Sequence, residues 1–227
     1  MGNPKFSYID ILNNDKVIEN YNKIDTVNPY PFNHGLKHVK NVCNIMDKLC
    51  DKLDITWEEK DALLIACALH DIGQVDGREE HWKKAKLFTI LHFENELKNL
   101  EYYNDILEAI ENHDNVCDIN NPLFWILVQF CDKMDFSKDR LEDNYRENYR
   151  ENFRYYCYED INRIDFIFDE RNFGIDIITN DIPDFNDMFL SENFPKKVIN
   201  AVNILALKLN KEPIIKTNGN ILSVNYN

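Results

Sequence analysis

The chain has 227 residues, a hydrophobic share of 44% and a net charge of −14, which is the profile of a soluble globular protein that can bury a core without disulfides. This excess of acid argues against a nucleic-acid polymer as the main partner, because binding to its phosphates depends on Lys and Arg. No stretch reaches the roughly 20 apolar residues that span a bilayer, so no membrane partner is expected.

The cysteines indicate a reducing compartment. There are six of them and no CxxC pair, and four lie in apolar helical stretches, where a small reduced thiol is the usual role. The first residues show no apolar core of the length of a signal peptide. A cytoplasmic protein is therefore expected.

The spacing of apolar residues predicts successive helices in the first 136 residues. Thr56 and Glu59 form a capping box at the start of the most apolar of these helices, and Gly73 follows its end as a natural stop. The expected helices cover residues 9–21, 33–53, 56–71, 79–100, 104–113 and 122–136.

The pattern changes after residue 138. A charged, aromatic helix is expected over residues 139–160, followed by two strands around a turn within residues 164–178. A helix should begin near Pro195, and Asn218-Gly219 is typical of a hairpin turn between two short strands. The predicted fold class is thus mainly α, a helical bundle over residues 1–140 with a small elaboration of β-hairpin and helix over residues 141–227, packed on the same domain.

Candidate metal ligands lie on the inward faces of five predicted helices. Asp71 follows the apolar run of residues 62–69, and a buried carboxylate is costly unless it is paired or bound to a metal. Each candidate also has a simpler explanation, as a hydrogen-bonded core histidine or one half of an ion pair, but their coincidence favours a metal site. The candidates are His38, His70, Asp71, His81, His113 and Asp132.

These residues resemble a known signature. The order His38, His70-Asp71, Asp132 is similar to the H…HD…D pattern of the HD-domain metal-dependent phosphohydrolases, and His70-Asp-Ile-Gly73 has the HDIG form. The resemblance covers about residues 28–140. It implies an HD-type helical domain in which these four residues bind one metal ion.

His81 and His113 are similar to two further histidines of the dinuclear HD proteins, which would add a second ion with Asp71 as the bridge. Imidazole and carboxylate ligands suit Fe, Mn, Co, Ni or Mg better than a structural zinc. One or two divalent metal ions are therefore expected as cofactors. His34 is interpreted as structural, supporting the helix that carries His38.

The sequence departs from the family pattern at several places. Gln74 stands where a basic residue frequently follows HDIG, and Asn41 replaces a frequent arginine. No Gly-Tyr-Pro segment follows His113, which argues against a cyclic-di-GMP phosphodiesterase. The Glu-Asp pair of the alarmone hydrolases is also missing.

The resemblance implies a phosphohydrolase that cleaves a phosphate ester or anhydride of a small molecule, with a nucleotide as the first candidate, through a metal-bound hydroxide. Asp71 would be catalytic as well as a ligand, and Lys133, Lys138 and Arg140 are expected to bind the substrate phosphate, unless they are ordinary surface charges. Two alternatives stay open: a di-iron oxygenase on the same scaffold, and a non-catalytic, nucleotide-binding regulatory module.

Two rows of side chains in the predicted helix of residues 139–160 complete the sequence interpretation. The arginines at 146, 150 and 154 lie within pairing distance of glutamates and indicate a solvated, salt-bridged face. The aromatic residues at 145, 149 and 153 are expected to pack against the core or against the partner subunit of a homodimer.

Overall fold

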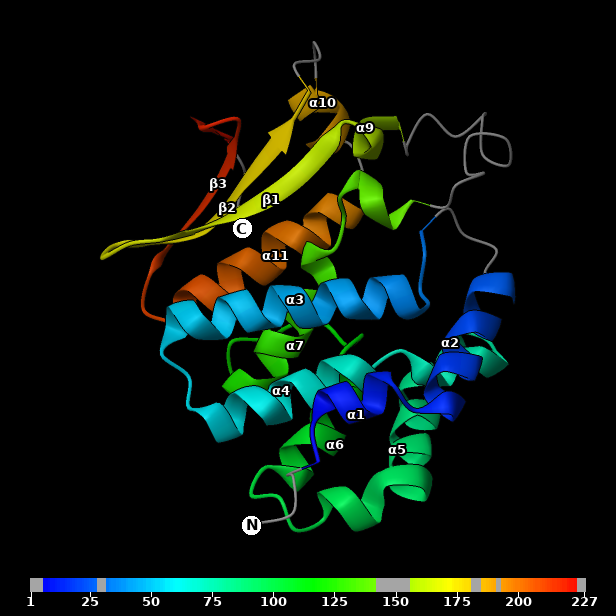
Figure 1. The fold of residues 1–227 in the computed structure, drawn as a ribbon. Helices are drawn as coiled ribbons and strands as arrows, with labels where there is room; N and C mark the ends of the chain where they lie inside the picture. Colours follow the sequence, from blue (N-terminus) through cyan, green and yellow to red (C-terminus); the bar gives the residue numbers. More distant parts are fainter. Residues whose placement is uncertain (1–5, 28–31, 142–155, 181–184, 191–192, 224–227) are drawn as a thin grey trace.

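The computed structural model describes residues 6–27, 32–141, 156–180, 185–190 and 193–223. The part before residue 142 is helical, as predicted (Figure 1). Its elements are α1 (Tyr8–Leu12), α2 (Asp15–Val27), α3 (Leu36–Leu53), α4 (Trp57–Leu69), the short 3₁₀ helix η1 (Ile72–Asp76), α5 (His81–Leu97), α6 (Tyr103–Asn112), α7 (Leu123–Met134) and the 3₁₀ helix η2 (Lys138–Arg140).

The first predicted helix is wrong in one respect, because residues 9–21 belong to two helices. The side chain of Asn14 accepts hydrogen bonds from the backbone N–H groups of Lys16 and Val17, at 3.0 and 3.4 Å. An asparagine oxygen that caps these N–H groups starts a new helix instead of continuing the old one. The chain therefore turns between α1 and α2.

The later part of the chain forms a four-stranded sheet in the order β1-β2-β3-β4. β1 (Ile161–Phe168) and β2 (Asn172–Thr179) form one predicted hairpin, and β3 (Glu212–Thr217) and β4 (Asn220–Ile221) form the other. The sequence did not predict that β2 and β3 pair in parallel and so join the two hairpins. α9 (Tyr156–Glu159), α10 (Phe185–Leu190) and α11 (Asn193–Lys208) complete the fold.

α11 is the crossover between the parallel strands β2 and β3, and it lies between the sheet and the helical part of the molecule (Figure 1). It packs against α7 on one side and against β2 and β3 on the other. The predicted helix over residues 139–160 falls largely on residues 142–155, which lie outside the described residues, as do both of its rows of side chains.

The core is organised around α4. Every residue from Asp61 to Leu69 is buried, and α4 contacts α1, α3, α6 and α7. A helix that is apolar on all sides must be enclosed by other elements. The end of α4, where His70 and Asp71 follow, therefore lies deep inside the helical part.

Two close contacts hold the chain around this end of α4. The Tyr21 hydroxyl of α2 donates a hydrogen bond to the Ala68 carbonyl at 2.8 Å. Gly73 approaches α5 so closely that a Cβ atom would lie 2.0 Å from the His81 carbonyl oxygen and 2.5 Å from the Ala85 nitrogen. Glycine is needed here for lack of space, and the approach brings the HDIG turn against the start of α5.

No helix among the described residues combines the length and the apolar character needed to cross a membrane.

The contact of Tyr21 is open to a direct test. Tyr21→Phe should lower the free energy of unfolding by about 1–2 kcal/mol, because a buried carbonyl loses a hydrogen bond. The control is Tyr103→Phe, since the Tyr103 hydroxyl makes no hydrogen bond within the described residues, and its effect should stay within about 0.5 kcal/mol. Urea denaturation followed by circular dichroism measures both, and equal losses would contradict the role given to Tyr21.

Candidate metal centre

The six candidate ligands come together at one place in the helical part. His38 is on α3, His70 and Asp71 follow α4, His81 opens α5, His113 ends α6, and Asp132 is on α7. All six residues are buried, with exposed fractions of 6% or less. Five helices thus converge on a common centre, as the inward faces in the sequence predicted.

One half of the centre lies between α3, α4 and α7. His38 Nε2 is 3.2 Å from Asp132 Oδ1, and His70 Nε2 is 3.7 Å from the same oxygen. One ligand atom from each of these three residues fits within a 4.8 Å span. This spacing allows the three side chains to bind a single ion.

The other half surrounds the second oxygen of Asp71. Asp71 Oδ1 lies 3.3 Å from His113 Nε2 and 3.5 Å from His81 Nε2, while Asp71 Oδ2 faces His70 and His38 at 3.5 and 3.7 Å. His70, Asp71 and His113 form a second group of adjacent ligand atoms. Asp71 therefore has one oxygen toward each half, which is the position a bridging carboxylate needs.

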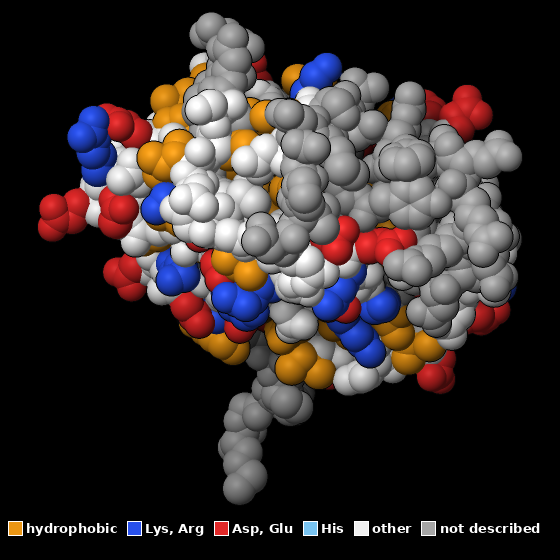
Figure 2. Space-filling model, turned by 90° about the horizontal axis from the view of Figure 1, so that it is seen from above, with side chains coloured by type: hydrophobic (Ala, Val, Ile, Leu, Met, Phe, Trp, Pro, Cys, Tyr) orange, Lys and Arg blue, Asp and Glu red, His pale blue; other side chains and the backbone are white. Residues whose placement is uncertain are grey.

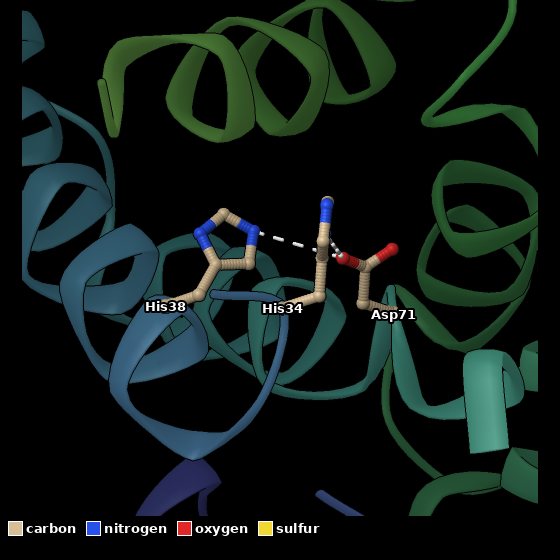
Figure 3. A group of neighbouring side chains, drawn as sticks. All are labelled: His34, His38 and Asp71. Atoms are coloured by element: carbon tan, nitrogen blue, oxygen red, sulfur yellow. Dashed lines mark hydrogen bonds and ion pairs between the residues drawn. The ribbon is translucent and has the colours of Figure 1, made fainter. Parts of the chain in front are cut away.

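His34 joins this centre, which the sequence analysis did not predict. Its Nδ1 lies 3.2 Å from Asp71 Oδ2, and Figure 3 shows the rings of His34 and His38 beside that oxygen. These three residues form a third group of adjacent ligand atoms. Burial lowers the pKa of His34 to about 4, so the ring is neutral at pH 7. The spacing of four residues between His34 and His38 could have indicated two side chains on one helix face. His34 precedes α3, however, so helical periodicity does not apply to it.

The hydrogen bonds of the histidines show that the centre fits a metal ion. Nδ1 of His70, His81 and His113 lies 2.7–2.9 Å from the backbone carbonyl oxygen three residues earlier. Because a carbonyl only accepts, Nδ1 carries the hydrogen, and in a neutral ring Nε2 is then left with a lone pair. Metal-binding histidines are oriented in the same way by an acceptor behind the ring.

Within the described residues, the Nε2 lone pairs of these three histidines accept no hydrogen bond from a backbone N–H group or a lysine or arginine side chain. His70 Nε2 is buried and has no hydrogen-bond partner there, and the Nε2 atoms of His81 and His113 face each other at 3.0 Å. Two lone pairs at this distance repel unless a proton or a metal cation lies between them. The donor set therefore matches a metal ion.

The charges of the centre favour a cation. Burial alone would raise the pKa of Asp71, but the charge of His70 and the contacts with His113 and His34 outweigh burial and hold this pKa well below its usual range. Burial opposes charge on His70, yet Asp71 and Asp132 together raise its pKa to about 10. The centre therefore takes up a positive charge, and a metal ion competes with the proton for it.

Asp135 supports the centre from outside and was not predicted. His38 Nδ1 lies 2.6 Å from Asp135 Oδ2, and the Asn41 side chain donates to Asp135 Oδ1 at 3.2 Å. Asp135 thereby orients the His38 ring, with Nε2 toward Asp71 and Asp132. A second acid three residues after Asp132 was the signal in the sequence.

A cavity of about 290 Å³ opens onto the centre, and its walls include Asp71, His81, His113 and Asp132. A larger groove of about 620 Å³ between α3 and β1 contains none of the six candidate ligands. The smaller cavity is the relevant one because it reaches the ligands. Four cationic side chains line it: Arg78, Lys133, Arg140 and Lys197.

Lys133 and Arg140, both expected to bind phosphate, lie in this wall. Lys133 Nζ is 2.5 Å from Asp132 Oδ2 and 3.5 Å from Asp114 Oδ1. Burial opposes its charge, but the two carboxylates outweigh burial and raise the pKa of Lys133. Arg140 also has a structural task, since its guanidinium donates to the carbonyl oxygens of Asn33 and Asp135.

Lys138 is placed elsewhere. Its ammonium group donates to Asn162 Oδ1 on β1 at 2.7 Å, and the residue is not part of the cavity wall. The 3₁₀ turn of η2 directs Lys138 and Arg140 to different neighbours, so proximity in sequence to Asp132 was a poor guide. The structure does not support a phosphate contact for Lys138.

The charge on the face shown in Figure 2 is mixed, since Lys and Arg side chains lie beside Asp and Glu side chains there. The chain as a whole has a net charge of −14, and against this background the wall of the cavity contains four cationic side chains.

A buried His/Asp centre held by consecutive helices defines a helical domain with side chains that could hold a metal ion. A family model for the HD domain matches residues 35–147, and the chain belongs to the HD-domain family, as the sequence predicted. This family places the chain in a superfamily of metal-dependent hydrolases. A search of curated proteins found no match.

The role of Asp135 generates a prediction. Asp135→Asn should lower the affinity for metal by about 10–100-fold, because the amide cannot hold His38 as the carboxylate does. Competition with a chelating dye measures the affinity. Asp139→Asn, an exposed neighbour, is the control and should leave it unchanged; an unchanged affinity in Asp135→Asn as well would show that His38 needs no such support.

Proposed function

We propose that this protein is a metal-dependent phosphohydrolase that cleaves a phosphate ester or anhydride bond of a small molecule, with a nucleotide as the first candidate. The observation that carries the proposal is the position of Asp71 between two groups of histidines, at the end of a cavity lined by cations. Ligands for a metal and groups for an anion thus meet at one place.

The distances support two sets of ligands. His38, His70, Asp71 and Asp132 would hold one divalent ion, and His81 and His113 would hold a second one with Asp71. Fe, Mn, Co, Ni and Mg all accept such imidazole and carboxylate ligands. When bound, such ions polarise a phosphoryl oxygen and lower the pKa of a water molecule.

The protein itself supplies orientation and charge. Asp71 has both oxygens inside the centre and is the candidate for positioning the attacking water. Lys133 stays charged beside Asp132 and is the first candidate for binding the phosphate. Arg78, Arg140 and Lys197 add positive charge around the same cavity.

The cations also favour this function over its alternatives. A di-iron oxygenase could use the same ligands, but one that acts on a neutral substrate has no need of four cationic side chains around its cavity. A phosphate group does need them, since charge-assisted hydrogen bonds are the strongest contacts available to it. A regulatory module that binds nucleotides without turnover would share the cavity, and only the measurement of hydrolysis separates it from an enzyme.

The central test is metal content together with hydrolysis. Protein purified without a metal-affinity tag or chelator should contain about two equivalents of a transition metal if both ligand sets are occupied. It should hydrolyse members of a panel of nucleotides and simple phosphate esters. Asp71→Ala should lose both metal and hydrolysis while its far-ultraviolet circular dichroism stays helical.

Asp76→Ala is the matched control, because Asp76 is an exposed acid in the same turn. It should keep both the metal and the activity. Hydrolysis that persists in Asp71→Ala would refute the mechanism, and metal-loaded protein that cleaves no phosphate ester would leave a binding module as the better description.

The phosphate contact of Lys133 can be tested separately. Lys133→Met should lower kcat/KM by about 10–100-fold through the loss of a charge-assisted hydrogen bond. Lys138→Met is the control and should change kcat/KM by less than about twofold, because the Lys138 ammonium group donates a hydrogen bond to Asn162 and is not in the cavity wall. The metal content of both variants is measured in the same experiment. If Lys133→Met also loses metal, Lys133 acts by holding the ligand Asp132 and not by binding the phosphate.

A further inference from the structure

A second cavity, of about 300 Å³, adjoins the cavity of the metal centre. It lies between the loop after α6 and the first half of α11, and the two cavities share Asp114, Lys133 and Lys197 in their walls. Each cavity is small for a ligand of ordinary size, but together they form a site of suitable volume. The shared residues lie at the boundary between the two.

The loop that forms one wall is held in place. The ammonium group of Lys208 on α11 donates to the carbonyl oxygens of Ile119 and Asn121, at 3.0 and 2.9 Å. This contact ties the loop to α11 on the side beyond the cavity. The second cavity is therefore built from two elements that are joined to each other.

The wall combines apolar surface with one unsatisfied acceptor. Val116, Cys117 and Ala201 supply the apolar part. Gln129 is 1% exposed, and its Nε2 donates to the carbonyl oxygens of Asn112 and Asn115, at 2.7 and 3.4 Å. Its Oε1 is buried without a hydrogen-bond partner among the described residues.

The orientation of this amide has a chemical consequence. Because two carbonyls hold Nε2, the amide cannot turn over, and Oε1 remains an acceptor that faces no donor. A buried acceptor of this kind favours a ligand that brings an N–H group. Apolar surface beside such an acceptor suits a flat heterocycle with N–H groups on its edge.

We infer that the second cavity is the subsite for the group to which the phosphate is attached, and that it accepts a nucleobase. This inference rests on the proposed function. The phosphate would lie between Lys133 and Lys197, next to the metal centre, and the base would lie against Val116, Cys117 and Ala201 with Gln129 as its acceptor. Selectivity among phosphate esters would then depend on this cavity.

Cys117 provides a readout that does not depend on turnover. It is the partly exposed cysteine of the subsite, while Cys43, Cys50, Cys67 and Cys131 are buried. Burial raises the pKa of the Cys117 thiol to about 11, so alkylation by a maleimide at pH 8 will be slow enough to follow. Mass spectrometry of the peptide that contains Cys117 gives the rate.

The probes are nucleoside monophosphate analogues of the four common bases, in which a methylene group replaces the bridging ester oxygen, so that the metal-loaded protein cannot hydrolyse them. At about ten times its Kd, the preferred nucleotide should slow alkylation of Cys117 by about 10-fold. The ribose phosphonate without a base, inorganic phosphate and pyrophosphate should have little effect. Equal protection by any of these three and by the nucleotides would overturn the inference.

Two variants on α11 test the position of the subsite. Asn200→Trp places an indole in the wall and should lower the nucleotide affinity, measured by calorimetry, to that of the ribose phosphonate. Asn203→Trp puts the same side chain on the same helix outside the wall, and it should bind as the unmodified protein does. Both should keep their metal content. Unchanged nucleotide affinity in Asn200→Trp would refute the placement.

The outcomes separate this inference from the proposed function. If the protein hydrolyses phosphate esters but no nucleotide protects Cys117, the nucleobase subsite is refuted and the proposed phosphohydrolase activity stands. If a nucleotide protects Cys117 but the metal-loaded protein hydrolyses no phosphate ester, the subsite stands and the proposed phosphohydrolase activity is refuted.

Discussion

The buried carboxylate of Asp71 is the constraint on which the arrangement of this protein depends. It stands at the end of α4, a helix with no exposed face from Asp61 onward, and so lies in a region where an unpaired negative charge would be very costly. The cost is offset by histidines that arrive from the surrounding elements. The packing of α3 and α6 against α4, and of α5 against η1, surrounds this carboxylate with imidazole rings.

The same constraint explains the polar contacts behind the histidines. Backbone carbonyls orient His70, His81 and His113, and the carboxylate of Asp135 orients His38. These acceptors lie on the outer side of each ring, so the nitrogen that faces the centre is left for a ligand bond. The cationic side chains line the cavity that opens onto the centre, where Lys133 forms an ion pair with Asp132.

The part of the chain after residue 156 takes part in this site through α11. That helix connects two parallel strands and has to cross the sheet, and its contacts with α7 bring Lys197 to the wall of the cavity at the metal centre. The same crossover forms one side of the adjoining cavity. The elaboration of the helical domain thus contributes to the surroundings of the metal centre.

The sequence by itself determined the helical class, the family and the six residues that face inward, because helical periodicity and the HDIG turn are local properties of the chain. The break at Asn14 was within reach of the same reasoning, since a side-chain cap is also local. Only the tertiary structure decided the rest. The parallel pairing of β2 with β3, the contact of Asp135 with His38 and the separation of Lys138 from Arg140 depend on residues far apart in the chain. The position of His34 next to Asp71 likewise follows from packing in three dimensions, as does the presence of Lys133 and Lys197 in one cavity wall. No local sequence pattern predicts either.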